Sequence, residues 1–425
     1  MVKEGYKKTE LGEIPVEWEV KKIEDITEFV GSGVTPRGGQ SVYKTNGIPF
    51  IRSQNVYPEG LRLDDVVYID EVQNQKMKRT EFKENDVLLN ITGASIGRCT
   101  TVPKGVGKGN VNQHVCIIRL LKNTDSHYIS FFINSDRGKK QIDSYNGGSS
   151  REGLNFKQVG GIKIIIPPPP EQQKIASILS TVDQHIEEID SLIEKTKELK
   201  KGLMQKLLTK GIGHTEFKKT EVGEIPVEWE VNKLSKICTN ITIGLVKTMT
   251  KNYVERGVPL IRNSDIKDCK INKEKLIYLD KCFSQQNEEK RLKKGDIVTV
   301  HTGDIGTSAV IDEELDGCHG FATLNTTVNK NIIYENYLCR FFNSEKFIRQ
   351  ALSFSTGDGR NNLNLKDFVN TNITYPKNIA EQKQIVDILS SIDGKIFQYE
   401  TKKGKLQYLK KGLMQQLLTG KKRVI

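Results

Sequence analysis

The chain has 425 residues, a net charge of +12 at pH 7 and a hydrophobic fraction of 36%. This apolar content excludes a disordered or collagen-like chain, and no run of about 18 apolar residues predicts a transmembrane helix. The seven cysteines form no Cys-x-x-Cys pair, and the N-terminus lacks the apolar stretch of a signal peptide. We therefore expect a soluble, cytoplasmic protein of two or three domains, whose basic balance favours a polyanionic partner.

The sequence contains one long tandem repeat. The segment TELGEIPVEWEV from Thr9 returns from Thr220 with one change, an offset of 220 − 9 = 211 residues. The segment KKGLMQKLLT from Lys200 returns as KKGLMQQLLT from Lys410, an offset of 410 − 200 = 210 residues. The stretches between such blocks differ, which indicates one scaffold that carries two different binding surfaces. The alternative is an old duplication whose middle parts drifted without a functional reason.

Each half begins with a part that we expect to be α/β. Short β-rich runs bounded by Gly, Pro or Asn predict strands. These runs are DVLLNITG from Asp86, VCIIRL from Val115, GIKIIIP from Gly161, DIVTVHTG from Asp296 and TNITYP from Thr371. The segments Tyr128–Asn134 and Tyr337–Asn343 predict short amphipathic helices. Trp18 and Trp229, with their flanking Pro and Val, are interpreted as packing that docks each segment on its domain.

Each half ends in a long predicted helix with a heptad-like apolar row. The first follows Pro167–Pro170 and extends from Glu171 to Thr209, about 58 Å at 1.5 Å per residue. Apolar residues recur at steps of four and three, the pattern of a coiled coil, and the row includes Leu199 and Leu409. The residues chosen as helix-packing positions are Ile175, Leu179, Val182, Ile186, Ile189, Leu203, Ile385, Leu389, Ile392, Ile396 and Leu413.

We expect the two helices to pack against each other. The connection from Thr209 to Thr220 is short, so the second globular part starts beside the far end of the first helix, which favours an antiparallel pair. Matching glycines, Gly202 and Gly412, indicate a close approach at that place or, equally, a local kink.

With these motifs in this order, the chain resembles the specificity subunit of type I restriction–modification systems. The resemblance is carried by GEIPVEWEV from Gly12 and Gly223, the strand Ile164–Pro168, Glu-Gln at 171 and 381, and KKGLMQ-x-LLT. It implies two pseudo-symmetric α/β target-recognition domains separated by two long helices, which pack as an antiparallel coiled coil. The expected division is 1–166 and 214–376 for the domains, and 167–213 and 377–425 for the helical spacers.

The resemblance also implies the function. Each domain would bind one half of a bipartite sequence in double-stranded DNA, and the helical pair would set the spacing. That pair would also dock two methyltransferase subunits and the restriction subunits. The chain itself would have no catalytic residue and no cofactor, because S-adenosylmethionine, ATP and Mg²⁺ would belong to the partner subunits.

The candidate DNA-binding residues lie in polar loops that differ between the halves. Arg, Asn and Gln read base edges, and Lys, Ser and Thr mostly contact phosphates. Solvated loops are the alternative throughout, and for the equivalent pair Arg52 and Arg262 it is a salt bridge that caps a strand. The candidates are Thr35, Arg37, Arg52, Ser53, Gln54, Asn55, Lys108, Asn110, Gln113 and Arg151, then Lys247, Lys251, Arg262, Asn263, Ser264, Arg360 and Asn361.

Catalytic motifs are missing from the sequence. We find no Asn-Pro-Pro-aromatic motif, no convincing glycine-rich cofactor loop and no ATP-binding loop. His114 with Cys116, and Cys318 with His319, are too few ligands to predict zinc, so buried free thiols are expected and no metal site. Two alternatives stay open: a divergent nuclease or methyltransferase that acts by itself, and a structural protein whose helices drive assembly.

Overall fold

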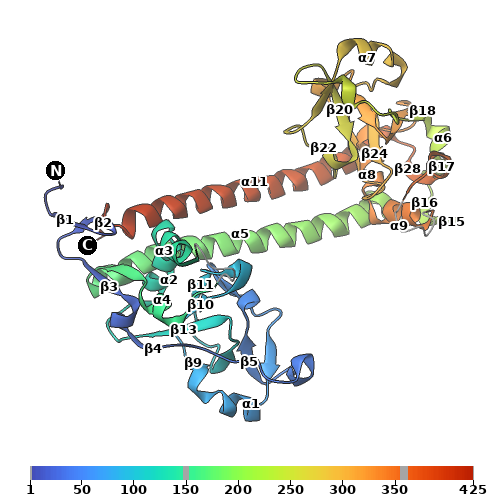
Figure 1. Cartoon of the computed structure of the whole chain (residues 1–425). Helices are drawn as coiled ribbons and strands as arrows, with labels where there is room; N and C mark the ends of the chain where they lie inside the picture. Colours follow the sequence, from blue (N-terminus) through green and yellow to red (C-terminus); the bar gives the residue numbers. More distant parts are fainter. Residues whose placement is uncertain (1, 147–152, 355–361, 425) are drawn as a thin grey trace. The chain divides into compact units, whose positions relative to one another are not determined.

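The computed structural model describes residues 2–146, 153–354 and 362–424. The chain divides into two compact units, Met1–Ser191 with Glu400–Ile425 (unit 1) and Leu192–Tyr399 (unit 2). Two long helices, α5 (Pro169–Lys210) and α11 (Ile379–Leu417), each contribute one end to each unit (Figure 1). Each unit therefore combines one globular domain with the beginning of one helix and the end of the other.

The domain of unit 1 is built on two four-stranded sheets. The first has the order β11 (Cys99–Thr101), β10 (Val87–Asn90), β13 (Val115–Leu120), β4 (Thr27–Ser32), with antiparallel pairs throughout. The second has the order β8 (Val67–Ile69), β5 (Ile48–Ile51), β12 (Gly109–Val111), β9 (Glu81–Phe82), and its central pair is parallel. Three two-stranded pairs complete it: β1 (Tyr6–Thr9) with β2 (Gly12–Pro15), β3 (Glu19–Lys22) with β14 (Lys163–Ile166), and β6 (Val56–Tyr57) with β7 (Gly60–Leu61). Its short helices are α1 (Glu71–Lys76), α2 (Ser126–Asn134), α3 (Asp136–Asn146) and α4 (Phe156–Gly160).

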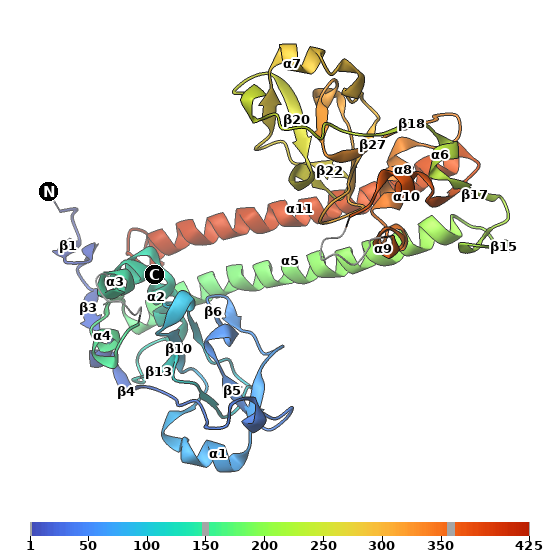
Figure 2. The same ribbon diagram turned by 45° about the vertical axis from the view of Figure 1, so that its right-hand side comes forward.

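Unit 2 repeats this arrangement. Its first sheet has the order β25 (Ser308–Val310), β24 (Ile297–Val300), β27 (Thr323–Val328), β18 (Cys238–Ile243). Its second has the order β19 (Tyr253–Val254), β23 (Ile277–Leu279), β20 (Val258–Arg262), β26 (His319–Phe321), again with one parallel pair, β20–β26. The pairs are β15 (Phe217–Thr220) with β16 (Gly223–Pro226), β17 (Trp229–Lys233) with β28 (Asn372–Pro376), and β21 (Ile266–Lys267) with β22 (Lys270–Ile271). Its short helices are α6 (Leu234–Ile237), α7 (Lys281–Gln285), α8 (Glu335–Phe342), α9 (Glu345–Ser353) and α10 (Leu365–Val369), and α9 lies beside the end of α5 (Figure 2).

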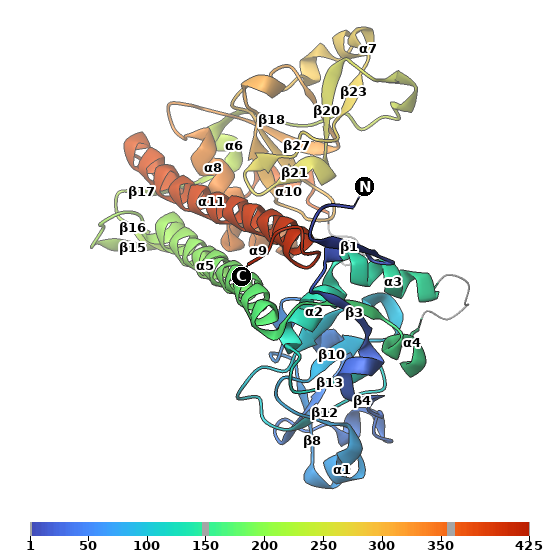
Figure 3. The ribbon, with the colours of Figure 1, turned by 90° about the vertical axis from the view of Figure 1, so that its left-hand side faces the viewer.

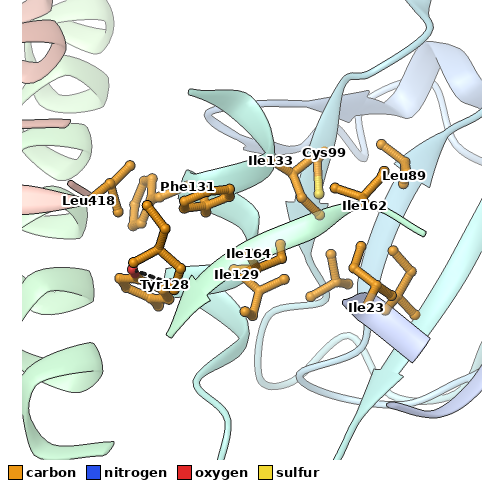
Figure 4. Close-up of a cluster of buried hydrophobic side chains, with 14 of the residues drawn as sticks. Ile23, Leu89, Cys99, Tyr128, Ile129, Phe131, Ile133, Ile162, Ile164 and Leu418 are labelled. Carbon is orange, nitrogen blue, oxygen red and sulfur yellow. Dashed lines mark hydrogen bonds between the residues drawn. The ribbon is translucent and has the colours of Figure 1, made fainter. Parts of the chain in front are cut away.

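Helix α2 forms the centre of the core in unit 1. Its sequence predicts an amphipathic helix, but Tyr128–Asn134 is buried throughout, because α2 packs between the first sheet and the two long helices. Ile129 and Ile133 face the strands, whereas Phe131 lies against Leu418, just beyond the end of α11 (Figure 4). The Tyr128 hydroxyl donates to the Ile165 carbonyl at 2.8 Å and thereby ties α2 to β14.

A glutamate at the start of each long helix, buried at position 171 and partly buried at 381, anchors the repeated Trp. In unit 1 the Trp18 indole donates to Glu171 at 2.9 Å, and the Arg423 guanidinium makes two hydrogen bonds to the same carboxylate. The N-terminal hairpin closes over this place, beside the end of α11 (Figure 3), where the Tyr6 hydroxyl donates to the Gly420 carbonyl. Trp18 is fully buried, which confirms that it docks its segment on the domain.

The equivalent anchor in unit 2 uses a histidine in place of the arginine. Glu381 accepts hydrogen bonds from the Trp229 indole, the Ile212 amide and His214. The glutamine that follows each glutamate is also used alike in the two units. Gln172 accepts from the Asp125 amide, and Gln382 accepts from the Tyr334 amide, so each fixes the start of α2 or α8. The Glu-Gln motif is therefore the joint between domain and helix.

The two helices run antiparallel within each unit. In unit 1, Asp183 of α5 pairs with Lys410 of α11 at 2.5 Å, and Asp190 pairs with Lys403 at 2.6 Å. In unit 2, Lys200 of α5 pairs with Asp393 of α11 at 2.8 Å. Asp183 and Asp393 occupy equivalent repeat positions, as do Lys200 and Lys410, so the same ion pair forms twice with the roles of the helices exchanged. This exchange confirms the predicted antiparallel pairing.

All of the predicted helix-packing positions are buried or partly buried. Those that are buried are Ile175, Leu179, Val182, Ile186, Ile189, Ile385, Leu389 and Ile392, and those partly buried are Leu203, Ile396 and Leu413. The row nevertheless fails at Leu199 and Leu409, which are 53% and 49% exposed. Each of these two leucines follows two successive steps of three residues, and one such step falls about 60° short of a full turn, so the row leaves the seam there.

One of the two interpretations of the matching glycines is excluded. A Cβ atom added at Gly202 or Gly412 would meet no heavy atom within 4 Å, so neither glycine marks a close approach of the helices.

Removal of one partner from the Asp183–Lys410 pair should destabilise unit 1. The two side chains are only 12% and 15% exposed, and Lys410→Met would leave the carboxylate without its cation. We expect a loss of about 3 kcal/mol in the free energy of unfolding, measured by urea denaturation. Asp183→Asn combined with Lys410→Met should cost less than the sum of the single changes. The exposed neighbour Lys411→Met serves as a control; an equal loss there would refute the assignment.

The Glu171 anchor should make stability depend on pH. Burial raises the pKa of Glu171, but hydrogen bonds from Arg423, Trp18 and the Val424 amide outweigh it and hold the pKa below the ordinary 4.5. A carboxyl with a lowered folded pKa stabilises above its unfolded pKa, and this contribution is lost as the pH falls through the folded pKa. Arg423→Ala should therefore cost about 2 kcal/mol at pH 7 and progressively less below pH 4.5.

Urea denaturation between pH 3 and pH 7 measures this difference. The adjacent exposed Lys422→Ala provides the matched control, with no expected pH-dependent loss. A loss for Arg423→Ala that stays constant over the whole range would contradict the role of Glu171.

Candidate nucleic-acid interface

Three loops of unit 1 meet at an open concave surface of about 390 Å³. The turn after β5 brings Ser53 and Gln54, and the turn after β10 brings Thr92–Ser95. His114, between β12 and β13, closes the third side. All three loops leave the edges of the two sheets, which explains how residues far apart in the sequence share one surface. We call this surface, with Tyr57 and Arg98, the unit 1 loop surface.

Side-chain hydrogen bonds hold these loops together. The Asn90 amide at the end of β10 donates to the Ser53 carbonyl at 2.8 Å and to the Ser95 hydroxyl at 3.1 Å. His114 bonds to both Thr92 and Gln113. Gln113 in turn accepts from Thr35, so the loop after β4 joins the same surface. Four predicted candidates, Thr35, Ser53, Gln54 and Gln113, are thus brought together by the fold.

Two arginines and a tyrosine form a basic stack that sequence reasoning missed. Arg62 lies 3.7 Å from the centre of the Tyr57 ring, and Arg98 lies 4.9 Å from it. Tyr57 and Arg98 line the unit 1 loop surface. The nearest signal in the sequence was the Thr-Gly turn that precedes Arg98, but nothing in the spacing indicated that the turn would face Tyr57. Such cations suit a phosphate backbone or the face of a base.

The equivalent arginines of the two units are partly committed within the protein. Arg262 makes two hydrogen bonds to Asp265, one from Nε and one from Nη2, each at 3.0 Å. Arg52 donates to the Asp65 carbonyl at 3.1 Å. The strand-capping salt bridge is therefore present at Arg262, which also donates to the Lys275 carbonyl at 3.2 Å. Arg52 keeps only the bond to the equivalent carbonyl, that of Asp65, because Asn55 stands where unit 2 has Asp265. Both arginine side chains remain partly exposed.

Two candidates are removed by the structure. Asn110 in β12 is fully buried, and its amide bonds to Asn74 and the Met77 carbonyl. Asn55 is also fully buried, and it closes its own turn by accepting from the Arg52 amide. Both side chains satisfy hydrogen bonds inside the domain, so neither is available to a ligand at the surface. Lys108 is exposed and pairs with Glu71 at 3.3 Å, and Arg37 is exposed.

In unit 2 the corresponding loops carry other residues. Lys247 donates to the Asn287 side chain at 2.7 Å and lies over the Phe283 ring, whereas Lys251 and Ser264 are exposed. The Asn263 side-chain oxygen is buried and has no hydrogen-bond partner among the described residues. Candidates Arg151, Arg360 and Asn361 lie outside the described residues. The residues that flank them, Gly153 and Asn362, form bridges to Thr92 and Thr302 of the Thr-Gly turns.

Several cysteines and His319 are buried, as is typical of residues that contribute to packing. Burial raises the pKa of the Cys99, Cys116 and Cys318 thiols to about 12. His319 is buried and bonds to the Ser284 hydroxyl at 2.9 Å. Among the described residues, no three His, Cys, Asp or Glu side chains are grouped so that they could hold a metal ion. None of the described helices has the length and hydropathy needed to cross a bilayer.

Comparison with known proteins finds the repeat as two matches to one family model. The model of the type I restriction modification DNA specificity domain matches residues 15–200 and again residues 226–410. The type I restriction enzyme MjaVIII specificity subunit of Methanocaldococcus jannaschii is 29% identical over 99% of this chain and 96% of its own length. The EcoKI specificity subunit of Escherichia coli K12 is 22% identical over 88% of this chain and 82% of its own.

Solved structures share the fold. A chain from a study of complex assembly and conformational transition of the type I R-M system matches with a TM-score of 0.60 at 15% identity, over 96% of this chain and 99% of that one. The S subunit of the type I system from M. genitalium matches with a TM-score of 0.56 at 15% identity, over 94% and 96%. Since the family model covers most of the sequence, this chain belongs to the family of type I restriction–modification DNA specificity domains and carries that domain twice.

Proposed function

We propose that this chain is the DNA sequence-specificity subunit of a type I restriction–modification complex. The observation that carries the proposal is the repeat itself: two domains share one scaffold and one anchor, yet they present different side chains at equivalent loops. Gln54 of unit 1 corresponds to Ser264 of unit 2, and Ser53 corresponds to Asn263. Such differences suit two domains that each bind one half of a bipartite sequence.

The residues of the unit 1 loop surface support the proposal that the ligand is double-stranded DNA. Hydroxyl and amide groups at Ser53, Gln54 and Gln113 can donate to and accept from base edges, and Arg98 can contact a phosphate. Phosphate contacts of this kind release counterions, so the binding should weaken as the salt concentration rises. A bipartite target with an unread spacer matches a protein that carries two such surfaces on a shared pair of helices.

We further propose that the chain supplies recognition while its partners supply catalysis. Two methyltransferase subunits and the restriction subunits would dock on the helical pair and the adjoining scaffold, and they would bind S-adenosylmethionine, ATP and Mg²⁺. The relatives support this division, because they are named specificity subunits of restriction enzymes. A divergent enzyme that acts by itself is not favoured, and DNA methylation or cleavage by the purified chain alone would revive it.

Domain exchange tests the two-surface model. The segment between β3 and β14 would be replaced by its equivalent from another family member with a different target, which leaves the Trp18–Glu171 anchor intact. We expect one half of the methylated motif to change to that of the donor, while the other half and the spacer stay the same. Sequencing of methylated bases in DNA from cells that express the complex measures this.

The reciprocal exchange between β17 and β28 is the matched control, and it should change only the other half. A single exchange that altered both halves would show that the two domains do not act independently. An exchange that altered neither half, in a complex that still methylates, would place recognition elsewhere.

A further inference from the structure

Each unit contains a pocket at an equivalent position of the repeat, outside the loop surfaces. The unit 1 pocket has a volume of about 670 Å³ and lies between α11 and the junction of α2 with α3. The unit 2 pocket has a volume of about 560 Å³ and lies between α5 and the junction of α8 with α9. Because each pocket is contained within one unit, its shape is set by local packing alone.

The most strongly repeated sequence in the chain lines these pockets. In the unit 1 pocket, the KKGLMQ-x-LLT block contributes Lys410, Lys411, Met414, Gln415, Leu418 and Thr419. In the unit 2 pocket, the equivalent side chains are Lys200, Lys201, Met204, Gln205, Leu208 and Thr209. The x position, Lys206 or Gln416, differs between the halves; it is exposed and lies outside both pockets. The two copies of this block therefore have identical residues where they line the pocket, and they differ at the exposed position beside it.

Each pocket holds a cation for which no anionic partner occurs among the described residues. Arg137 and Lys346 occupy equivalent positions in the first turns of α3 and α9. The Arg137 Nη1 atom is buried and has no hydrogen-bond partner among the described residues. Lys346 is partly buried, and no ion pair to it occurs in the described part of the chain. Burial lowers the pKa of both groups.

Three neighbouring cations of the pockets have anionic partners inside the chain. Lys200 pairs with Asp268 and Asp393, Lys201 pairs with Glu345, and Lys410 pairs with Asp183. A buried charge without a partner costs free energy, so its occurrence at the same place in both units points to an anion that comes from outside the chain.

The floor of each pocket indicates a protein ligand. Met414, Leu418 and Phe131 line the unit 1 pocket, and Figure 4 shows Phe131 against Leu418. Met204, Leu208 and Phe341 line the unit 2 pocket. A DNA phosphate would satisfy the cation but would bring no apolar side chain to this floor. A polypeptide segment with a carboxylate beside an apolar residue satisfies both, and flexible methionines adapt to such contacts.

We propose that the two pockets bind two copies of one acidic segment of the methyltransferase subunit. The segment's carboxylate pairs with Arg137 in unit 1 and with Lys346 in unit 2, and its apolar neighbour lies on the methionine and leucine floor. A ligand that is the same in both units accounts for pockets that are nearly identical, whereas the loop surfaces differ because the two half-sites differ. This inference rests on the proposed function and adds to it the contact residues and the chemistry of the bound segment.

Neutral substitutions separate binding from folding. Arg137→Met and Lys346→Met keep the length and the apolar contacts of the side chain but remove the charge. In the chain with the methyltransferase subunit of its own system, native mass spectrometry should find two copies bound to the wild type. Each single variant should bind one copy tightly and the other at least tenfold more weakly, and the double variant should bind neither copy tightly. The melting temperature of the free chain should stay the same or rise, because an unpaired buried cation is removed.

Matched variants complete the test. Lys206→Met and Gln416→Met, which lie outside the pockets, should leave two copies bound, and Arg137→Lys and Lys346→Arg should restore binding. Unchanged affinity in the double variant, or a lower melting temperature that accounts for the loss, would overturn the pocket assignment alone. Weaker DNA binding with intact subunit binding would identify a phosphate site and overturn it as well. A wild-type chain that recruits no methyltransferase subunit would overturn the proposed function itself.

Discussion

Neither domain can complete its core without both long helices. The core of unit 1 includes Ile175 and Leu179 from the beginning of α5, and Leu417 and Leu418 from the end of α11. The core of unit 2 includes Ile385 and Leu389 from the beginning of α11, and Leu207 and Leu208 from the end of α5. Full burial of a leucine or isoleucine contributes about 1.5–3 kcal/mol, so these contacts bind each domain firmly to both helices. Antiparallel pairing is thus a condition of the fold and not an addition to it.

This constraint separates the parts of the molecule that must stay alike from those that are free to differ. The anchor residues, Trp18 with Glu171 and Trp229 with Glu381, keep their roles in both units. The side chain beside the carboxylate changes from Arg423 to His214, although each follows the end of a long helix. The loops after β5 and β20 lie away from these joints, so their side chains can change without loss of the fold. The loops that recognise DNA can therefore differ between the units while the helices and the anchors stay the same.

Much of the frame is predictable from the sequence, because the repeat shows which segments share a structure. The long helix expected over Glu171–Thr209 occurs as Pro169–Lys210, and the β-rich runs at Asp86 and Val115 form adjacent strands. The heptad row was wrong at Leu199 because two successive steps of three residues turn this position away from the seam. The Glu-Gln motif was visible, but its hydrogen bonds to Trp18 and Asp125 depend on contacts across more than 40 residues.

The interface was harder to predict, because polar residue type does not determine exposure. Asn110 has the chemistry to contact adenine, yet it lies in a buried strand, where its side-chain amide donates a hydrogen bond to Asn74. Tyr57 and Arg98 carried no signal of their own and became neighbours only because the β6–β7 hairpin packs against β11. The repeat compensated in part, since it showed where the two halves diverge, and those divergent loops are the ones that meet at the loop surface.

The central claim is that base recognition and spacing are set by separate parts of the chain. Insertion of one heptad into each helix, after Ser191 in α5 and after Tyr399 in α11, would lengthen the pair between the two units. Seven helical residues add about 10 Å, which corresponds to about three base pairs of B-DNA. Sequencing of methylated bases should show a longer spacer between two unchanged half-sequences. An altered half-sequence, or an active complex whose spacer keeps its original length, would contradict the account.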